Sequence, residues 1–137
     1  MKTFTIKRRI NFYDCDPAGI IFYSRVFEFA HSAYESLIQS IAKQEDYWNN
    51  DEFVVPIIST TANYIKPMKY EDEIMINVRV SELRASSFEL SYNLENETGE
   101  LLCSIKTVHV FVNKKSWVKI DIPQYITTEL EKYLATN

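Results

Sequence analysis

The chain has 137 residues, a formal net charge of −4 at pH 7, 46% hydrophobic residues and 25% charged residues. This length fits one domain, over residues 1–137, because a second core would need on the order of 50 further residues. The composition is too apolar for a disordered chain. An acidic chain without clustered Lys and Arg does not attract nucleic acid or an anionic membrane surface, so we expect neither as a partner.

Several sequence features bear on the location and assembly of the protein. No segment approaches the roughly 18 apolar residues of a membrane span, and Asp14 falls where a secretory signal needs an apolar run. Cys15 and Cys103 lack metal-type spacing and are expected to be reduced thiols. We therefore expect a cytoplasmic protein without a metal site. The aromatic content of 14% favours an oligomer contact rather than a solitary monomer.

The N-terminal part of the sequence predicts a strand, a loop and a helix. Residues 3–12 alternate between apolar and polar positions, which is typical of a strand with one buried face. The members of that face are Phe4, Ile6, Ile10 and Phe12. Residues 14–19 contain Pro, Gly and two Asp, which favour a loop. Apolar residues recur three or four positions apart over residues 23–43, and this spacing predicts the one long helix, with Ser24 as its candidate N-cap.

The rest of the sequence predicts strands and a short closing helix. Strand-like runs cover about residues 53–66, 72–83, 86–96 and 101–113, and Asn96 to Glu100 form a good turn between the last two. A helix is expected over about residues 123–134, with Pro123 at its start. Consecutive strands without intervening helices join as hairpins or meanders, so the predicted fold class is α+β with an antiparallel sheet.

Two carboxylates, Asp14 and Asp16, lie between the first strand and the long helix. Unpaired N–H groups at a helix start favour developing negative charge, so a carboxylate there can attack a carbonyl or activate water while those N–H groups stabilise the oxyanion. A purely structural interpretation is also open, because Asp before a helix commonly forms a cap or an Asx turn.

The segment from Phe12 to Glu35, with its Asp-Cys-Asp-Pro-Ala-Gly run, resembles the signature of the 4-hydroxybenzoyl-CoA thioesterase family of hotdog proteins. Downstream, Tyr64-Ile65-Lys66-Pro67, the stretch from Tyr70 to Ile74, and the run from Thr107 to Val112 resemble later segments of that family. The resemblance covers nearly the whole chain. It implies a hotdog fold, in which a five-stranded antiparallel sheet wraps a long central helix.

The resemblance also implies a site and a reaction. Asp16 matches the family's catalytic carboxylate, as nucleophile or general base, and Tyr23 matches the residue whose backbone N–H polarises the thioester carbonyl. Gly19 would let the backbone pass close to the acyl group, and Asp14 would shape the loop. No metal or redox cofactor is implied, since coenzyme A is part of the substrate. Active sites at a subunit interface imply a homo-oligomer, a dimer or a tetramer.

The sequence departs from the family at informative positions. A short-chain acyl-CoA branch has Tyr and His where this chain has Phe12 and Tyr23, so an aromatic acyl group such as hydroxybenzoyl or dihydroxynaphthoyl is favoured. Family members commonly have Gly at the position of Glu71, which puts one turn in doubt.

Other reactive side chains fit structural roles better. His31 and His109 form no metal pair and are expected to be packed or hydrogen-bonded. Cys15 lies between two carboxylates, which raise the pKa of a thiol and argue against a Cys nucleophile. Candidate partners for coenzyme A phosphates are Lys66, Lys69, Arg84, Lys106, Lys114 and Lys115.

The predicted function is hydrolysis of an acyl-CoA thioester through Asp16. Three alternatives remain open at this stage: a non-catalytic hotdog protein that binds acyl-CoA or an acyl carrier protein, a thioesterase acting on acyl carrier protein, and a structural oligomer without a ligand.

Overall fold

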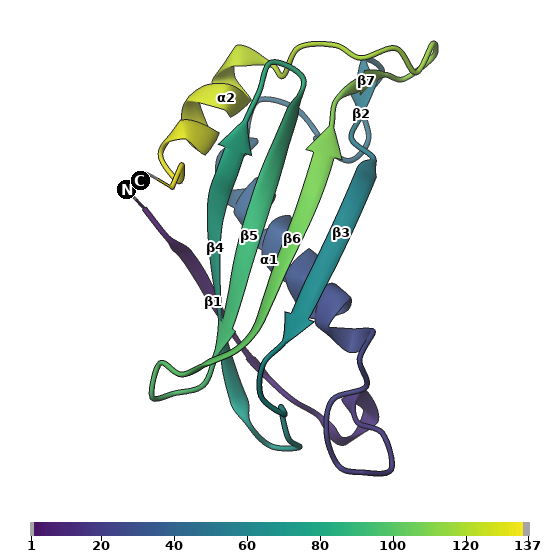
Figure 1. Cartoon of the computed structure of the whole chain (residues 1–137). Helices are drawn as coiled ribbons and strands as arrows, with labels where there is room; N and C mark the ends of the chain where they lie inside the picture. Colours follow the sequence, from purple (N-terminus) through teal and green to yellow (C-terminus); the bar gives the residue numbers. More distant parts are fainter. Residues whose placement is uncertain (1, 136–137) are drawn as a thin grey trace.

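Five antiparallel strands form the main sheet of this computed structural model, which describes residues 2–135. The strand order is β1-β4-β5-β6-β3 (Figure 1). Their bounds are β1 Phe4–Arg9, β3 Ile57–Tyr64, β4 Glu73–Leu83, β5 Ser87–Glu95 and β6 Leu101–Val110. All neighbouring pairs are antiparallel. The predicted α+β class with a five-stranded antiparallel sheet is therefore confirmed.

The helix α1 (Arg25–Ile41) lies against one face of this sheet (Figure 1). Its apolar stripe is buried, and the members are Val26, Phe29, Ala30, Ala33, Tyr34, Leu37, Ile38 and Ile41. The opposite stripe, with Glu28, His31 and Glu35, faces solvent. The prediction of a long central helix wrapped by the sheet is therefore met only in part, because α1 has 17 residues and the sheet covers one of its sides. Ser24 occupies the N-cap position as predicted, but its side chain makes no capping hydrogen bond.

Three of the predicted strands have other bounds in the structure. The first strand ends at Arg9, so Phe12 lies in a 3-10 helix, η1 (Phe12–Asp14), and is 76% exposed instead of buried. The run predicted over residues 53–66 is divided at Pro56 into β2 (Phe53–Val54) and β3, and that over 101–113 into β6 and β7 (Val112–Asn113). Pro56 has no backbone N–H to donate to a neighbouring strand, so it interrupts the first of these runs. The short strands β2 and β7 pair with each other and are not part of the main sheet.

The C-terminal helix α2 (Gln124–Glu131) begins directly after Pro123, close to the predicted start. The chain then returns to β4, where the Val80 N–H donates to the Tyr133 carbonyl at 2.9 Å. Ile126 and Leu130 from α2 join the same buried cluster as α1 and the sheet.

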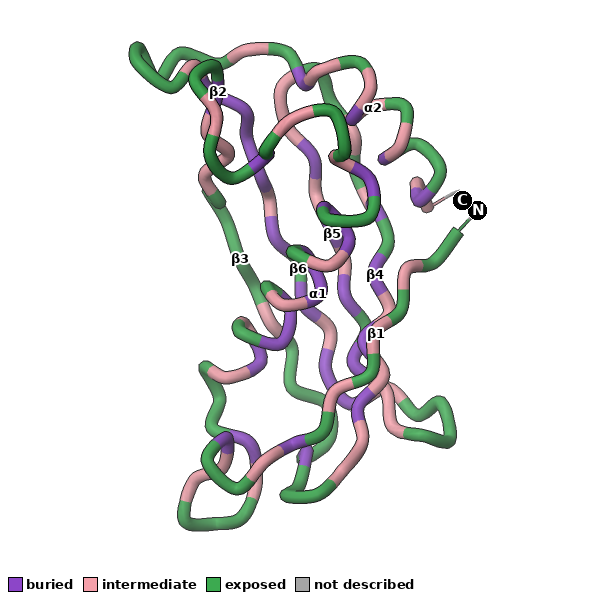
Figure 2. Tube along the Cα trace, turned by 180° about the vertical axis from the view of Figure 1, so that it is seen from behind, coloured by how far each residue is buried: buried purple, intermediate pink, exposed green. Residues whose placement is uncertain are grey.

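The strand β3 forms one edge of the sheet and is largely exposed, as Figure 2 shows by its green trace. No charged residue occurs from Ile57 to Tyr64. Strand edges in soluble proteins are commonly protected by charge, Pro or a covering element, so this uncharged edge is available for pairing. No helix within residues 2–135 is long and apolar enough to cross a membrane.

Candidate active site

The segment between β1 and α1 is a tight loop fixed by backbone hydrogen bonds. The Asp16 N–H donates to the Ile20 carbonyl at 2.9 Å, and Cys15 and Ile21 form a further antiparallel bridge. The Phe22 N–H donates to the Asp14 carbonyl at 2.8 Å, while the Ile21 N–H donates to the Met68 carbonyl at 2.8 Å. These bonds join the loop to the chain that follows β3, so both segments contribute to one site.

Asp14 is fully buried and organises the start of this loop. Its Oδ2 atom accepts a hydrogen bond from the Asn11 N–H at 2.9 Å. Its Oδ1 atom has no hydrogen-bond partner among residues 2–135. The burial places Asp14 in the structural role that the sequence predicted for it.

Asp16 is half-buried and has one oxygen engaged. Its Oδ1 atom accepts a hydrogen bond from the Ala18 N–H at 2.8 Å, which is an Asx turn. Within the described chain, Oδ2 makes no hydrogen bond. One oxygen of Asp16 therefore has the Asx-turn role that the sequence left open. The other oxygen is free to take part in a reaction.

Gly19 completes the turn with a φ of +80°, a conformation that residues with a Cβ rarely adopt. Its N–H donates to the Asp16 carbonyl at 2.9 Å. Gly19 does not line the cavity that contains Asp16, so the structure supports its role in shaping the loop and does not place it beside an acyl group.

Tyr23 directly precedes the N-cap of α1, and its backbone N–H has no hydrogen-bond partner among residues 2–135. Its carbonyl accepts a hydrogen bond from the Tyr64 hydroxyl at 2.5 Å, which fixes the end of β3 against the start of α1. An unpaired N–H at the positive end of a helix dipole is suited to stabilise an oxyanion.

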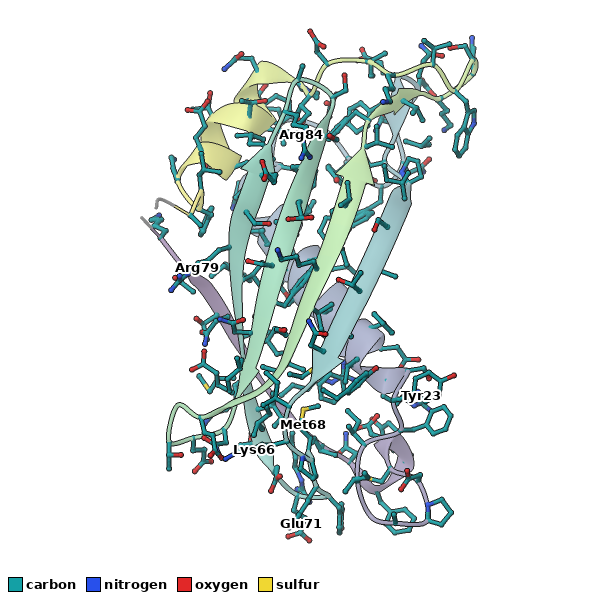
Figure 3. The ribbon with its side chains drawn as sticks, in the orientation of Figure 1. Tyr23, Lys66, Met68, Glu71, Arg79 and Arg84 are labelled. Atoms are coloured by element: carbon teal, nitrogen blue, oxygen red, sulfur yellow. The ribbon has the colours of Figure 1, made fainter. Side chains whose placement is uncertain are left out.

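Asp16 and Tyr23 line one cavity of about 390 Å³. Its remaining lining comes from Ile20, Ile21 and Phe22 of the loop and from Tyr64, Ile65, Lys66, Pro67 and Met68. Figure 3 shows Tyr23 on one side of Met68 and Lys66 on the other. The site thus combines apolar walls with a few polar residues, among them a carboxylate, the composition expected of a small-molecule site.

A larger cavity of about 580 Å³ adjoins the first and shares Lys66 and Pro67 with it. Lys66 pairs there with Glu100. Carboxylates predominate in its lining: Glu71, Asp72, Glu73, Glu97 and Glu100, against Lys66 and Lys69. This excess of negative charge opposes phosphate binding. Arg84, Lys106, Lys114 and Lys115 line neither cavity, and Figure 3 shows Arg84 at the far end of the sheet.

Neither cysteine is suited to be a nucleophile. Partial desolvation, followed by the charges of Asp14 and Asp16, raises the pKa of Cys15. Burial raises the pKa of Cys103 to about 11. A raised pKa lowers the thiolate fraction at neutral pH, as the sequence predicted for Cys15.

His109 belongs to a buried polar cluster rather than to the cavity with Asp16. Its Nε2 atom bonds to the Thr107 hydroxyl at 2.7 Å, and that hydroxyl bonds to the Tyr92 hydroxyl at 2.8 Å. The ring stacks on Phe88 with centroids 4.7 Å apart. Burial, with a smaller contribution from His31, lowers the pKa of His109 to about 3. The predicted packed and hydrogen-bonded role is therefore confirmed.

His31 is partly exposed on α1, with Nε2 3.5 Å from Glu35 Oε1. Within residues 2–135, no three His, Cys, Asp or Glu side chains are grouped to hold a metal ion.

Several cavity residues received no individual role from the sequence. Tyr64 is the last residue of β3 and Met68 lies in the segment after it, both more than 40 residues from Asp16 along the chain. The likeness of Tyr64-Ile65-Lys66-Pro67 to a family segment was the one signal that pointed to this region. Which of these side chains faces Asp16 depends on how the sheet packs against the loop.

The turn at Glu71 keeps the conformation that Gly adopts easily. Glu71 has a φ of 76°, and the turn is closed by the Asp72 N–H donating to the Lys69 carbonyl at 3.0 Å. Glu71 therefore adopts a conformation that favours Gly, and the consequence is local backbone strain.

Comparisons with known proteins identify the family and the fold of the chain. The family model described as "Thioesterase-like superfamily" matches residues 10–130. A 1,4-dihydroxy-2-naphthoyl-CoA hydrolase from Nostoc punctiforme is 28% identical over 136 residues, which cover 98% of this chain and 88% of that protein. A crystal structure of a 1,4-dihydroxy-2-naphthoyl-CoA thioesterase from Synechocystis has a TM-score of 0.86 at 25% identity, covering 94% of this chain and 96% of the other. A 4-hydroxybenzoyl-CoA thioesterase variant complexed with 4-hydroxybenzoyl-CoA has a TM-score of 0.80 at 23% identity, over 92% and 97% of the two chains, and shows the same fold.

Proposed function

The chain belongs to the thioesterase-like superfamily, and from this premise we propose that it hydrolyses an acyl-CoA thioester with an aromatic acyl group, through Asp16. The family predicted from the sequence and the enzyme class, a thioester hydrolase, are confirmed by the match over residues 10–130 and by relatives named as acyl-CoA hydrolases. The aromatic acyl group is supported by relatives named for 1,4-dihydroxy-2-naphthoyl-CoA and by the apolar cavity walls.

One observation carries the proposed mechanism: Asp16, which has a free carboxylate oxygen, and Tyr23, whose backbone N–H is unpaired, line the same cavity. We propose that the thioester carbonyl oxygen accepts a hydrogen bond from the Tyr23 N–H. The negative charge that develops on this oxygen during attack is then stabilised by the N–H and by the positive end of α1.

Asp16 can act in either of two ways from this position. As a nucleophile, its free oxygen bonds to the carbonyl carbon, the C–S bond breaks and coenzyme A leaves as the thiolate; water then cleaves the resulting anhydride, which restores the Asp16 carboxylate and releases the acid and the proton that the thiolate takes up. As a general base, Asp16 takes a proton from the water that attacks the carbonyl, the same C–S bond breaks, and the proton passes to the leaving thiolate. Ala18 holds the other oxygen in both cases, so the carboxylate keeps one orientation. This chemistry needs no metal or redox cofactor.

We also propose that the single domain functions as a homo-oligomer in the cytoplasm, with a second copy paired along β3. The uncharged, exposed edge of β3 supports this assembly, because an unpaired strand edge is a template for another strand. Light scattering should give a mass above that of a 16.1 kDa monomer, and Ile58→Lys, at a side chain that is 62% exposed on β3, should lower that mass. A monomeric native protein would contradict this assembly.

The test of function is thiol release from a panel of acyl groups, each offered on coenzyme A and on an acyl carrier protein. The comparison is between native enzyme and Asp16→Asn, with Asp14→Asn as the matched control from the same loop. We expect aromatic acyl-CoAs to be the best substrates and release to depend on Asp16. Preference for the carrier protein would identify a carrier-protein thioesterase, whereas binding without release would identify a non-catalytic acyl-binding protein. No thermal shift with coenzyme A and no release would indicate a structural oligomer.

A further inference from the structure

A smaller cavity, distinct from the two described above, is lined by residues further along α1 than those of the cavity that contains Asp16. Its volume is about 160 Å³. Phe27 and His31 of α1 form one wall, Ile57 and Thr60 of β3 form the other, and Tyr92 and Thr107 form the floor. The two hydroxyls of the floor bond to each other at 2.8 Å, so they need no ligand to satisfy them. With Phe27 and Ile57 beside them, this compartment is suited to apolar groups.

The residues of the two cavities follow one helix stripe and one strand face. Tyr23, Phe27 and His31 are four residues apart, the spacing that places side chains above one another on a helix. On β3, the residues Tyr64, Ala62 and Thr60 alternate, and they pair with Cys103, Ile105 and Thr107 of β6. Those three β6 residues are buried, Cys103 and Ile105 in the same cluster as the buried residues of α1, and cross-strand partners share a face. The two cavities are therefore successive compartments of one groove between α1 and β3.

Tyr64 lies at the Asp16 end of this face of β3, and Ala62 lies between it and Thr60 of the second compartment. The Tyr64 ring lines the first cavity and does not line the second. Its hydroxyl donates to the Tyr23 carbonyl at 2.5 Å, so the side chain extends from the end of β3 to the start of α1. The next inward residue on this face of β3 is Ala62, whose side chain is a single methyl group.

We infer that Tyr64 is a specificity-determining residue that ends the acyl compartment beside Asp16 and excludes long linear acyl chains from the groove beyond. This inference rests on the proposed function, since the occupant is the apolar part of the acyl group. The Tyr64 side chain acts by filling space in the groove. A compact acyl group fits before the ring, and a longer chain meets it.

The geometry sets the expected size of the effect. One step from Tyr23 to Phe27 is about one helical turn, roughly 5.4 Å, which corresponds to about four methylene groups. Each buried methylene contributes roughly a fourfold change in affinity. Removing the ring should therefore raise kcat/KM at least about 10-fold for chains that reach the second compartment.

The experiment compares three proteins: the native enzyme, Tyr64→Val, and Tyr64→Val combined with Ala62→Leu. Valine suits an edge strand, and the native Tyr64 side chain is already 48% exposed, so the variant is expected to fold. Thiol release is measured with saturated acyl-CoAs from butanoyl to hexadecanoyl. In parallel, the Kd of the corresponding S-alkyl-CoA thioethers, which cannot be hydrolysed, is measured by calorimetry.

We expect Tyr64→Val to move the longest accepted chain up by about four carbons in both measurements, and Ala62→Leu to reverse the gain by refilling the groove. Identical chain-length profiles for the native enzyme and Tyr64→Val would overturn the inference. Failure of the proposed function gives a different result, namely no thiol release from any acyl-CoA by the native enzyme. The thioether profiles then decide the inference alone, since a shift in the Kd profile supports it and an unchanged profile overturns it.

Discussion

The loop before α1 and the inner face of the sheet each contain a polar side chain with an atom that makes no hydrogen bond. The two atoms differ in whether a substrate can reach them. In the loop, Asp16 keeps a free oxygen at a cavity. On the sheet, His109 has an unpartnered Nδ1 atom, but the ring is fully buried between Phe88 and Tyr34. Residue type alone would favour the histidine as the catalytic group. Accessibility reverses that order, because a general base or nucleophile must reach its substrate.

The same contrast occurs inside the loop. Asp14 and Asp16 are separated by one residue, yet Asp14 is fully buried and Asp16 faces the cavity. A chain that turns through Cys15 sends the two carboxylates in different directions. One carboxylate therefore stabilises the loop and the other is available to the substrate.

The largest expected effect separates these two carboxylates by activity. Asp16→Asn keeps the shape of the side chain and removes its charge, so turnover should fall by at least about 100-fold with an unchanged fold. Asp14→Asn should change turnover less than about tenfold. Steady-state thiol release and circular dichroism on both variants check this difference. A loss under tenfold for Asp16→Asn, or an equal loss for the two variants, would contradict the assignment.

The buried histidine should affect stability through pH. The pKa of His109 is lowered from 6.5 to about 3 in the folded protein, so below about pH 6.5 the unfolded chain binds a proton that the folded chain does not. The contribution of neutral His109 to the free energy of unfolding is fully present above about pH 6.5. It is lost as the pH falls from there toward the folded-state pKa of about 3. Between about pH 7 and about pH 5 this lowers the free energy of unfolding by about 2 kcal/mol.

Denaturant unfolding at several pH values measures this effect, with His109→Gln as the comparison. Gln removes the titration and keeps an amide near the Thr107 hydroxyl. Its free energy of unfolding should therefore fall less steeply toward low pH, and kcat should stay within about threefold of native. Equal pH slopes for both proteins would show that His109 does not control acid stability.

Truncation of the buried carboxylate should lower stability more modestly. Asp14→Ala leaves the Asn11 N–H without its acceptor, which costs about 1 to 2 kcal/mol of unfolding free energy. Chemical denaturation monitored by fluorescence gives this value. An unchanged midpoint would mean that the hydrogen bond contributes nothing net to the loop.

The smallest expected effect is a gain at the strained turn. Glu71 has a φ of 76°, so Glu71→Gly should relieve strain and raise the free energy of unfolding by roughly 0.5 to 1 kcal/mol after the entropic cost of Gly. Glu71→Ala is the control, because Ala has the same steric conflict and should give no gain. Thermal unfolding distinguishes them, and equal Tm values for the Gly and Ala variants would exclude strain as the cause.

The sequence by itself determined the helices and strands, and it singled out the loop that contains Asp14 and Asp16 as the candidate site. Alternation and three-to-four spacing predicted α1 and the strands, since these periods reflect one buried face, and Gly19 marked a backbone position with positive φ. The resemblance carried by the Asp-Cys-Asp-Pro-Ala-Gly run identified the family.

Only the tertiary structure decided which side chains meet. Phe12 continued the alternation of β1, but the chain leaves the sheet after Arg9, and the Phe12 ring is exposed. The alternation of apolar residues does not indicate where pairing with the neighbouring strand ends. The different burial of Asp14 and Asp16, and the position of Tyr64 across the groove, depend on contacts between segments far apart in the chain. Such contacts are set by how the sheet packs against the loop and α1, which no local pattern in the sequence encodes.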